Sequence, residues 1–286
     1  MRRRSRRVAP LLPRTSMNTS NKPPVLIITG YGVNCEAESK VAWEMAGADV
    51  RLVHLHDLLA EPGQLRSFKA LMFIGGFSFG DHMGSGHVLA LRIRHRLRDE
   101  IHRFIEAGNL ILGVCNGFQV MVKLGLLPGL DHDYFNQKIA LMQNDGGAFQ
   151  NFWVNLRFEA AAPCVFTRGI DRIPLPIRHG EGKIFTTDRD LLDKLERAHC
   201  VACRYVDSQT GEPTMSFPNN PNGSLNAIAG LCDPTGRIFG LMPHPEAYLF
   251  PENHPQWQRQ KLAGLLPQHG LGLKIFQNAV DFLNNS

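Results

Sequence analysis

The chain has 286 residues, of which 43% are apolar, and this is enough material for one domain with a sizeable core. No apolar run approaches the roughly 18 residues that cross a bilayer, so we expect no membrane association. The formal net charge of +5 is concentrated near the N-terminus, where residues 1–17 contain six arginines and no acidic residue. Removing those six charges leaves −1, so the composition argues against a nucleic-acid-binding surface on the rest of the chain.

The arginine-rich N-terminus has three interpretations: a targeting peptide, a disordered basic arm, or sequence upstream of a second start at Met17. We expect residues 1–22 to form a disordered basic extension and residues 23–286 to form one domain. The six cysteines come without an apolar signal sequence, which is typical of reduced thiols and predicts a cytoplasmic protein.

The first half of the chain alternates short apolar runs with helical periodicity. Continuous apolar strands separated by helices predict a mostly parallel sheet that is covered on both faces, in a three-layer α/β/α sandwich. Strands are expected at residues 25–29, 49–54, 71–74 and 110–114, and helices at residues 36–46 and 88–107.

The second half has a different pattern, with Pro- and Gly-bearing turns between apolar segments. Two or three β segments are expected within residues 148–180, followed by a short helix at 190–198. The runs 224–231 and 237–242 predict a hairpin around the turn Asp-Pro-Thr-Gly. Further elements are a strand at 200–206 and a last helix at 273–283.

Cys115 follows the apolar strand at 110–114 and precedes a helical run, with Gly113 and Gly117 two residues away on either side. Strand, nucleophile and helix in this order are typical of a nucleophile elbow, here with a thiol in place of a hydroxyl. We expect the glycines to allow the sharp turn and the helix N-terminus to lower the pKa of the thiol. A structural core cysteine is the alternative.

His244 and Glu246 lie in the run Met-Pro-His-Pro-Glu, directly after the strand expected at 237–242. Pro245 favours an extended backbone at His244. Residues two apart in an extended chain point to the same side, so Glu246 can hold the imidazole for proton transfer. The alternative is a surface histidine beside a helix-start glutamate.

A tetrahedral intermediate at a thiol nucleophile needs two N–H donors for its oxyanion. The N–H of Asn116, one residue after the nucleophile, is the first candidate. The loop at residues 75–81 offers Gly76 as the second, and places Phe77 and Ser78 at the substrate. This loop lacks the pattern of a phosphate-binding loop, and no Walker A motif occurs, so any ATP-driven step belongs to another chain.

Two further motifs carry groups that could bind a ligand or a metal. Residues 179–183 alternate polar residues, among them His179 and Glu181, with two glycines, and they are a substrate-binding loop, a turn or a rival base. Cys200 and Cys203 lie three apart in a strand and point to opposite faces, with no second pair to complete four ligands. We therefore expect no metal site.

Five runs together resemble the class I glutamine amidotransferases and, more narrowly, the glutaminase subunits of phosphoribosylformylglycinamidine synthase in de novo purine synthesis. The likeness extends over about residues 25–283. The runs that carry it are residues 75–81, 113–119, 124–129, 179–182 and 242–246.

The resemblance implies a flavodoxin-like glutaminase domain in which Cys115 attacks glutamine, His244 transfers protons and Glu246 orients His244. Gly76 and Asn116 would hold the oxyanion, and Gln119 would help to bind glutamine. Ammonia would pass to a synthetase subunit that uses ATP and Mg²⁺, with a small third subunit bridging the two. No cofactor is expected in this chain.

Two other functions remain open at this stage. The chain could be an amidotransferase that supplies ammonia to a different acceptor, because the glutamine site carries no information about the acceptor. It could also be a DJ-1-like protein, since such proteins share the cysteine elbow, although they lack a His-x-Glu run so far downstream.

Overall fold

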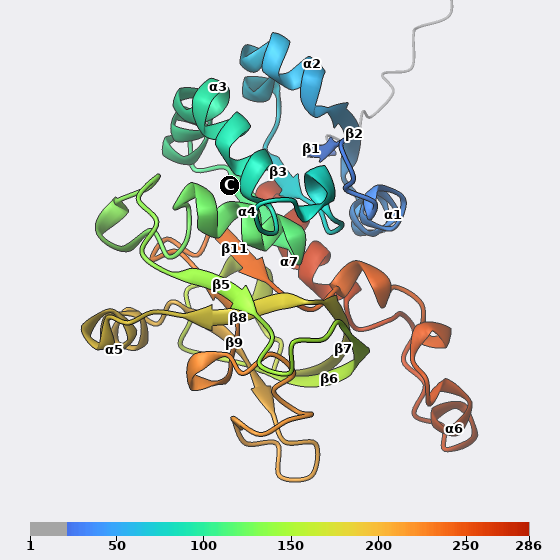
Figure 1. Cartoon of the computed structure of the whole chain (residues 1–286). Coiled ribbons are helices and arrows are strands. Elements are labelled where there is room, and N and C mark those ends of the chain that lie inside the picture. The colour runs from blue at the N-terminus through green and yellow to red at the C-terminus, as the bar shows by residue number, and fades with distance from the viewer. Residues whose placement is uncertain (1–21, 286) are drawn as a thin grey trace, which may run out of the picture.

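The computed structural model describes residues 22–285, so all but the last residue of the expected basic extension lies outside the described residues. One nine-stranded sheet runs through the molecule in the order β2-β1-β3-β4-β11-β10-β9-β6-β7, and a separate two-stranded sheet pairs β5 with β8 (Figure 1).

The first half of the chain builds the parallel part of the sheet. Strands β2, β1, β3 and β4 run parallel to one another, and β11 from the second half pairs parallel to β4. The strands of this half are β1 (Pro24–Thr29), β2 (Asp49–His54), β3 (Ala70–Phe73) and β4 (Leu110–Val114). Its helices are α1 (Glu36–Ala46), α2 (Leu55–Ala60), α3 (His87–Glu106) and α4 (Asn116–Leu124).

The second half builds the antiparallel part, in which neighbouring strands alternate in direction from β11 to β7. Its strands are β5 (Ala140–Gln143), β6 (Gln150–Phe158), β7 (Arg172–His179), β8 (Glu181–Phe185), β9 (Val201–Val206), β10 (Ile228–Cys232) and β11 (Ile238–Leu241). Its helices are α5 (Arg189–Arg197), α6 (Trp257–Leu262) and α7 (Leu273–Asn284).

Helices cover both faces of the parallel part, as right-handed crossovers require when the chain first steps from β1 to β2 and then back across to β3 and β4. Helices α1 and α7 pack together on one side, and α3 and α4 pack together on the other (Figure 1). Trp43 of α1 is fully buried against α7 and β3. Its ring meets Phe276 of α7 edge-on, with the centroids 5.4 Å apart, and its indole N–H donates to the Met72 sulfur of β3 at 3.1 Å.

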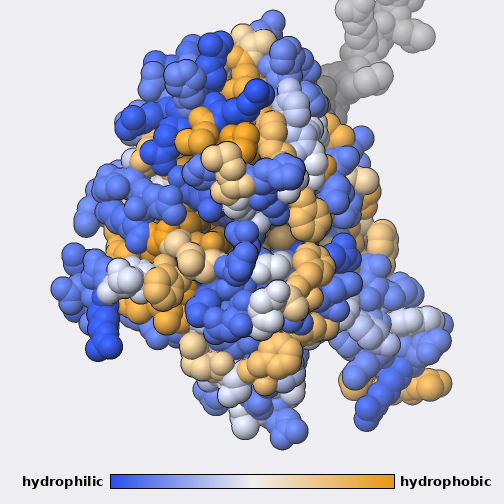
Figure 2. Space-filling model, viewed as in Figure 1, coloured by the Kyte–Doolittle hydropathy of each residue, from blue (hydrophilic) through white to orange (hydrophobic). Residues whose placement is uncertain are grey.

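The predicted α/β sandwich with a mostly parallel central sheet is confirmed, since five adjacent strands are parallel and β9 and β7 point the same way as they do. The hairpin of β10 and β11 is also confirmed. Segment 251–269, which carries α6, projects from the body, and its surface is mostly hydrophilic (Figures 1 and 2). No helix within residues 22–285 combines the length and the apolar character needed to traverse a bilayer.

Candidate active site

Cys115 stands between β4 and α4 in a strained backbone conformation, with φ 50° and ψ −108°. A positive φ is rare for a residue with a side chain, and it persists only where the surroundings enforce it. Here the Cys115 N–H donates to the Leu241 carbonyl of β11 at 2.9 Å, and the Cys115 carbonyl accepts from the Gln119 N–H of α4 at 3.0 Å. The predicted nucleophile elbow is therefore present, with its strain on the cysteine itself.

The two flanking glycines serve a different purpose from the one expected, because neither has a positive φ. A Cβ on Gly117 would lie 1.9 Å from the Phe73 carbonyl oxygen of β3. A Cβ on Gly113 would lie 2.2 Å from the Met121 sulfur of α4. The glycines let α4 pack directly against the sheet, and this close packing holds Cys115 in its turn.

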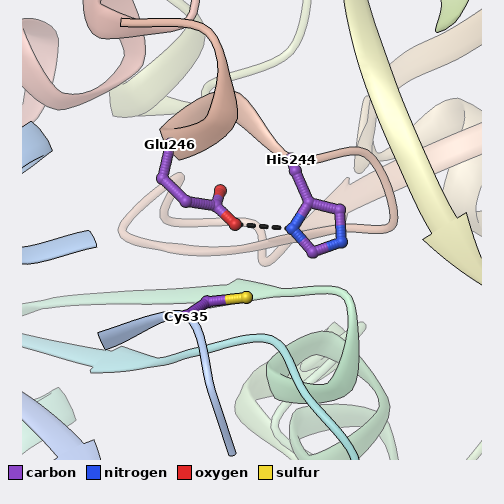
Figure 3. A group of neighbouring side chains, drawn as sticks. All are labelled: Cys35, His244 and Glu246. Atoms are coloured by element: carbon purple, nitrogen blue, oxygen red, sulfur yellow. Dashed lines mark hydrogen bonds and ion pairs between the residues drawn. The ribbon is translucent and has the colours of Figure 1, made fainter. Parts of the chain in front are cut away.

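His244 and Glu246 follow β11, where the chain leaves the sheet and enters the 3-10 turn Pro245–Ala247. His244 has the extended backbone that Pro245 favours, and its N–H donates to the Pro176 carbonyl of β7 at 2.9 Å. The His244 Nδ1 lies 2.5 Å from Glu246 Oε1 (Figure 3). Both residues are 2% exposed, so this pair is held away from solvent.

The charges around His244 favour its protonated form. Burial alone would lower the pKa of His244, but the Glu246 carboxylate and the Cys115 sulfur outweigh burial and raise this pKa well above its ordinary value. The Nδ1 is engaged by Glu246, whereas Nε2 is buried and has no hydrogen-bond partner within residues 22–285. The free Nε2 is the atom that can exchange a proton with a reacting group.

Cys115 and His244 line one cavity of about 210 Å³, together with Gly76 and Phe77. Gly76 has φ 134°, and a Cβ there would lie 2.6 Å from the Val33 Cα, so only glycine fits. Within residues 22–285 the Gly76 N–H donates to no backbone acceptor. Asn116 is the first residue of α4, and the first N–H groups of a helix have no partner inside the helix. Both predicted oxyanion donors thus lack a backbone acceptor in the described part of the chain, and their contact with an oxyanion stays a prediction.

Three of the other predicted substrate-binding residues lie behind the cavity wall and are tied to one another through Asn116. The Ser78 N–H donates to Asn116 Oδ1 at 3.3 Å, and Asn116 Nδ2 donates to Gln119 Oε1 at 3.0 Å. Gln119 Nε2 in turn donates to the Glu181 carbonyl at 2.6 Å. Glu181 lines a neighbouring cavity of about 230 Å³. A direct contact of Ser78, Gln119 or Glu181 with glutamine stays a prediction.

His179 is buried and does not line the cavity. Its Nδ1 lies 3.1 Å from Asn144 Oδ1, and its Nε2 has no partner within the described residues. Burial, and next the charge of His244, lower the pKa of His179 to about 3. The imidazole of His179 is therefore neutral and bonded to Asn144. Its role in substrate binding also stays a prediction.

Sequence reasoning missed six residues that line the cavity: Asn34, Cys35, Glu38, Phe149, Asn151 and Arg178. Two signals could have found some of them. Residues 34–38 follow β1 at the same strand-end edge where Cys115 and His244 follow their strands, and ligands of parallel sheets bind at that edge. Arg178 directly precedes the polar and glycine-bearing run at residues 179–183.

Cys35 brings a second thiol to His244 and Glu246, and their ligand atoms all lie within 4.8 Å of one another (Figure 3). Sulfur, imidazole and carboxylate are zinc ligands, but two ligands of one tetrahedral zinc lie about 3.3 Å apart. The 2.5 Å between His244 Nδ1 and Glu246 Oε1 is a hydrogen-bonding distance instead. The geometry is that of a base and the group that orients it.

A strained thiol, a buried imidazole–carboxylate pair and free N–H donors define a thiol acyl-transfer site on an α/β sheet. A family model described as the CobB/CobQ-like glutamine amidotransferase domain matches residues 22–283. This chain therefore belongs to that family, as the sequence predicted, and the DJ-1-like alternative is not supported.

Two relatives and one solved structure narrow the likeness. The chain is 43% identical over 260 residues to phosphoribosylformylglycinamidine synthase subunit PurQ of Dehalococcoides mccartyi, covering 91% of this chain and 97% of that protein. It is 41% identical over 268 residues to the same subunit of Methanococcus maripaludis, with coverages of 92% and 98%. The structure of PurLQS from Thermotoga maritima contains a chain with a TM-score of 0.67 and 30% identity, with coverages of 92% and 99%.

Proposed function

We propose that this chain is the glutaminase subunit of phosphoribosylformylglycinamidine synthase, which releases ammonia from glutamine and passes it to a synthetase subunit. The PurQ relatives match over nearly their full lengths, and the PurLQS neighbour supports an assembly with a separate synthetase chain. The observation that carries the proposal is the meeting of Cys115 and His244 in one cavity, with Glu246 on the far nitrogen of the imidazole.

In the first half-reaction, Cys115 gives its thiol proton to His244 Nε2, and its sulfur attacks the side-chain amide carbon of glutamine. The negative charge that develops on the amide oxygen is stabilised by the N–H groups of Gly76 and Asn116. The C–N bond then breaks, His244 Nε2 gives its proton to the leaving nitrogen, and ammonia departs. A glutamyl thioester remains on Cys115.

In the second half-reaction, His244 Nε2 takes a proton from water as the water oxygen attacks the thioester carbon. The same two N–H groups stabilise the second oxyanion, and the C–S bond breaks to release glutamate. Glu246 holds the imidazole in one orientation and stabilises its positive charge in both half-reactions. Glu246 acts through His244 and is therefore a positioning residue.

The synthetase partner would supply the ATP and Mg²⁺ chemistry, and a small subunit would bridge the two chains. We also propose a cytoplasmic location, which the six unpaired cysteines support. We also propose that the chain needs no cofactor of its own, because nucleophile, base and oxyanion donors are all proposed among its own residues.

The test is the Cys115→Ala variant in the assembled synthase. Glutamine-dependent synthesis should fall by about 10⁴-fold or more, because the nucleophile is gone. Ammonia-dependent synthesis should survive, because it bypasses the glutaminase. Near-normal use of glutamine by this variant would refute the proposed function, and Cys164→Ala, at a buried cysteine outside the cavity, is the matched control.

A further inference from the structure

Gly76 belongs to a pair of loops that meet beside the catalytic cavity. One loop follows β3, at residues 75–81, and the other follows β1, at residues 30–35. Two backbone hydrogen bonds join the loops, from the Phe77 N–H to the Gly32 carbonyl at 2.9 Å and from the Asn34 N–H to the Gly75 carbonyl at 3.1 Å. Gly76 lies between these bonds, opposite Val33 in an antiparallel bridge. At such a position the N–H points away from the partner strand, so the pairing sets the direction of the Gly76 N–H.

Each loop carries one strained residue next to this bridge. Tyr31 has φ 53°, and Phe79 has φ 54° with ψ 29°. Residues with a side chain rarely adopt this left-handed region, because it costs free energy that the surroundings must offset. The Phe79 N–H donates to the Tyr31 carbonyl at 2.6 Å, so the two strained residues are joined directly. If either residue relaxed, the loop pair would lose this bond and Gly76 would lose part of its support.

Three side chains favour the strained conformation, and we call them the ring–arginine stack: Tyr31, Phe79 and Arg92. The two rings are stacked, with their centroids 4.7 Å apart and an interplanar angle of 18°. The Arg92 guanidinium carbon, from α3, lies 5.5 Å from the Tyr31 centroid and 5.3 Å from the Phe79 centroid, within the range of cation–π attraction. Within residues 22–285 Arg92 forms no ion pair, so no carboxylate competes with the rings for its charge.

We propose that the ring–arginine stack positions Gly76 as an oxyanion donor. This inference rests on the proposed function, and it adds positioning residues to that reaction. None of the three side chains lines the cavity of Cys115, so they act through the loop pair. The stack offsets the strain at Tyr31 and Phe79 and thereby holds the Gly76 N–H in place before the reaction begins. A donor that is already oriented needs no reorganisation when charge develops on the amide oxygen.

Loss of the stack should therefore affect kcat and not KM. The oxyanion exists only in the tetrahedral intermediates, whereas bound glutamine has a neutral amide oxygen. An interaction that strengthens only in the transition state changes kcat and leaves substrate binding nearly unchanged. Alkylation of Cys115 by iodoacetamide gives a different readout, because sulfur displaces iodide and no oxyanion forms. The rate of this alkylation should not depend on the stack.

The test uses glutamine-dependent turnover by the assembled synthase. Phe79→Leu removes the ring and should lower kcat about 10- to 100-fold, somewhat less than the full loss of an oxyanion donor. Arg92→Met should lower kcat about 3- to 10-fold, because an exposed cation contributes less than the stacked rings. In both variants KM should stay within about 2-fold of its original value, and iodoacetamide should modify Cys115 at the original rate. Phe79→Tyr keeps the ring and should retain most of the turnover.

Matched controls remove the same kinds of side chain elsewhere. Arg96→Met removes an exposed charge one turn further along α3, and Phe217→Leu removes an exposed ring outside the cavity. Neither should change kcat. An unchanged kcat in Phe79→Leu, or an equal loss in Phe79→Tyr, would overturn the inference. So would slower alkylation of Cys115, or separation of the subunits in gel filtration, in Phe79→Leu or Arg92→Met. If the unaltered synthase uses ammonia but not glutamine, the proposed function fails instead, so the two failures are distinguishable.

Discussion

The first and second halves of the chain contribute to the site in different ways. In the first half, Cys115 is held by backbone contacts, with Gly117 so close to β3 that a methyl group would meet the Phe73 carbonyl at 1.9 Å. In the second half, His244 follows β11 and is held by a charged side chain, through the 2.5 Å contact with Glu246. Steric fit positions the nucleophile, and electrostatics positions the base.

The difference predicts two kinds of sensitivity. Adding volume around Cys115 should damage the first half of the chain, whereas removing charge beside His244 should lower activity with little effect on folding. The following variants test this contrast, from the largest expected effect to the smallest.

Gly117→Ala should be the most damaging of these changes. The new Cβ would lie 1.9 Å from a backbone oxygen that cannot move aside, so α4 must shift from the sheet. We expect a loss of more than about 3 kcal/mol in the free energy of unfolding, measured by urea denaturation. Gly63→Ala is the control, because its Cβ would have no neighbour within 4 Å. Equal free energies of unfolding for the two variants would contradict the claim that steric fit positions Cys115.

Glu246→Gln should leave the fold intact and reduce glutamine-dependent turnover by about 100-fold or more. Without the carboxylate, burial dominates and the pKa of His244 falls. The imidazolium is then lost at lower pH, so the alkaline limb of the rate profile should move toward acid. Glu252→Gln, at an exposed glutamate, should do neither. An unshifted profile for Glu246→Gln would contradict the electrostatic positioning of His244.

His179→Gln should make the protein less sensitive to acid. Because burial, and then the charge of His244, hold the pKa of His179 at about 3, the unfolded chain, with an ordinary value of 6.5, binds the proton first as the pH falls. The native state should lose about 2 kcal/mol between pH 8 and pH 5 from this group alone. The variant should lack this loss in urea titrations at the two pH values. An unchanged pH dependence would show that His179 is not held neutral.

Gly75→Ala tests a contact between the two halves, because Gly75 lies beside His244. It should have the smallest effect of these changes on turnover and stability. A Cβ at Gly75 would lie 2.9 Å from both the Cys35 sulfur and His244 Cε1, and both are side chains that can yield slightly. We expect turnover to fall about 10-fold through a displaced imidazole, with stability nearly unchanged. Adding Cys35→Ala should restore part of the rate. If Cys35→Ala restored none of the rate, crowding of Cys35 and His244 by the new methyl group would not be the cause of the loss.

Local patterns predicted the elements and the reacting residues. The strand, the cysteine and the following helix at 110–124 are contiguous in the chain, and so are His244 and Glu246. Their geometry therefore depends on short-range backbone rules, which a sequence displays directly. The same is true of Gly76, whose positive φ only glycine adopts easily.

The rest of the site depends on long-range packing. Glu38 and Arg178 are 140 positions apart, and they meet only because α1 and the end of β7 reach the same cavity. Gln119 bears an amide suited to a ligand, yet its Nε2 donates to the backbone carbonyl of Glu181 inside the protein. No spacing rule distinguishes a polar residue that faces a cavity from one that supports the wall behind it.

The most direct test of the central claim is covalent labelling of the assembled synthase by a glutamine analogue with an electrophilic carbon in place of its amide, followed by peptide mass spectrometry. The account predicts a single adduct on Cys115 and none on Cys35, although both thiols line the same cavity. An adduct on Cys35 with Cys115 unmodified, or no adduct on either cysteine, would contradict the account.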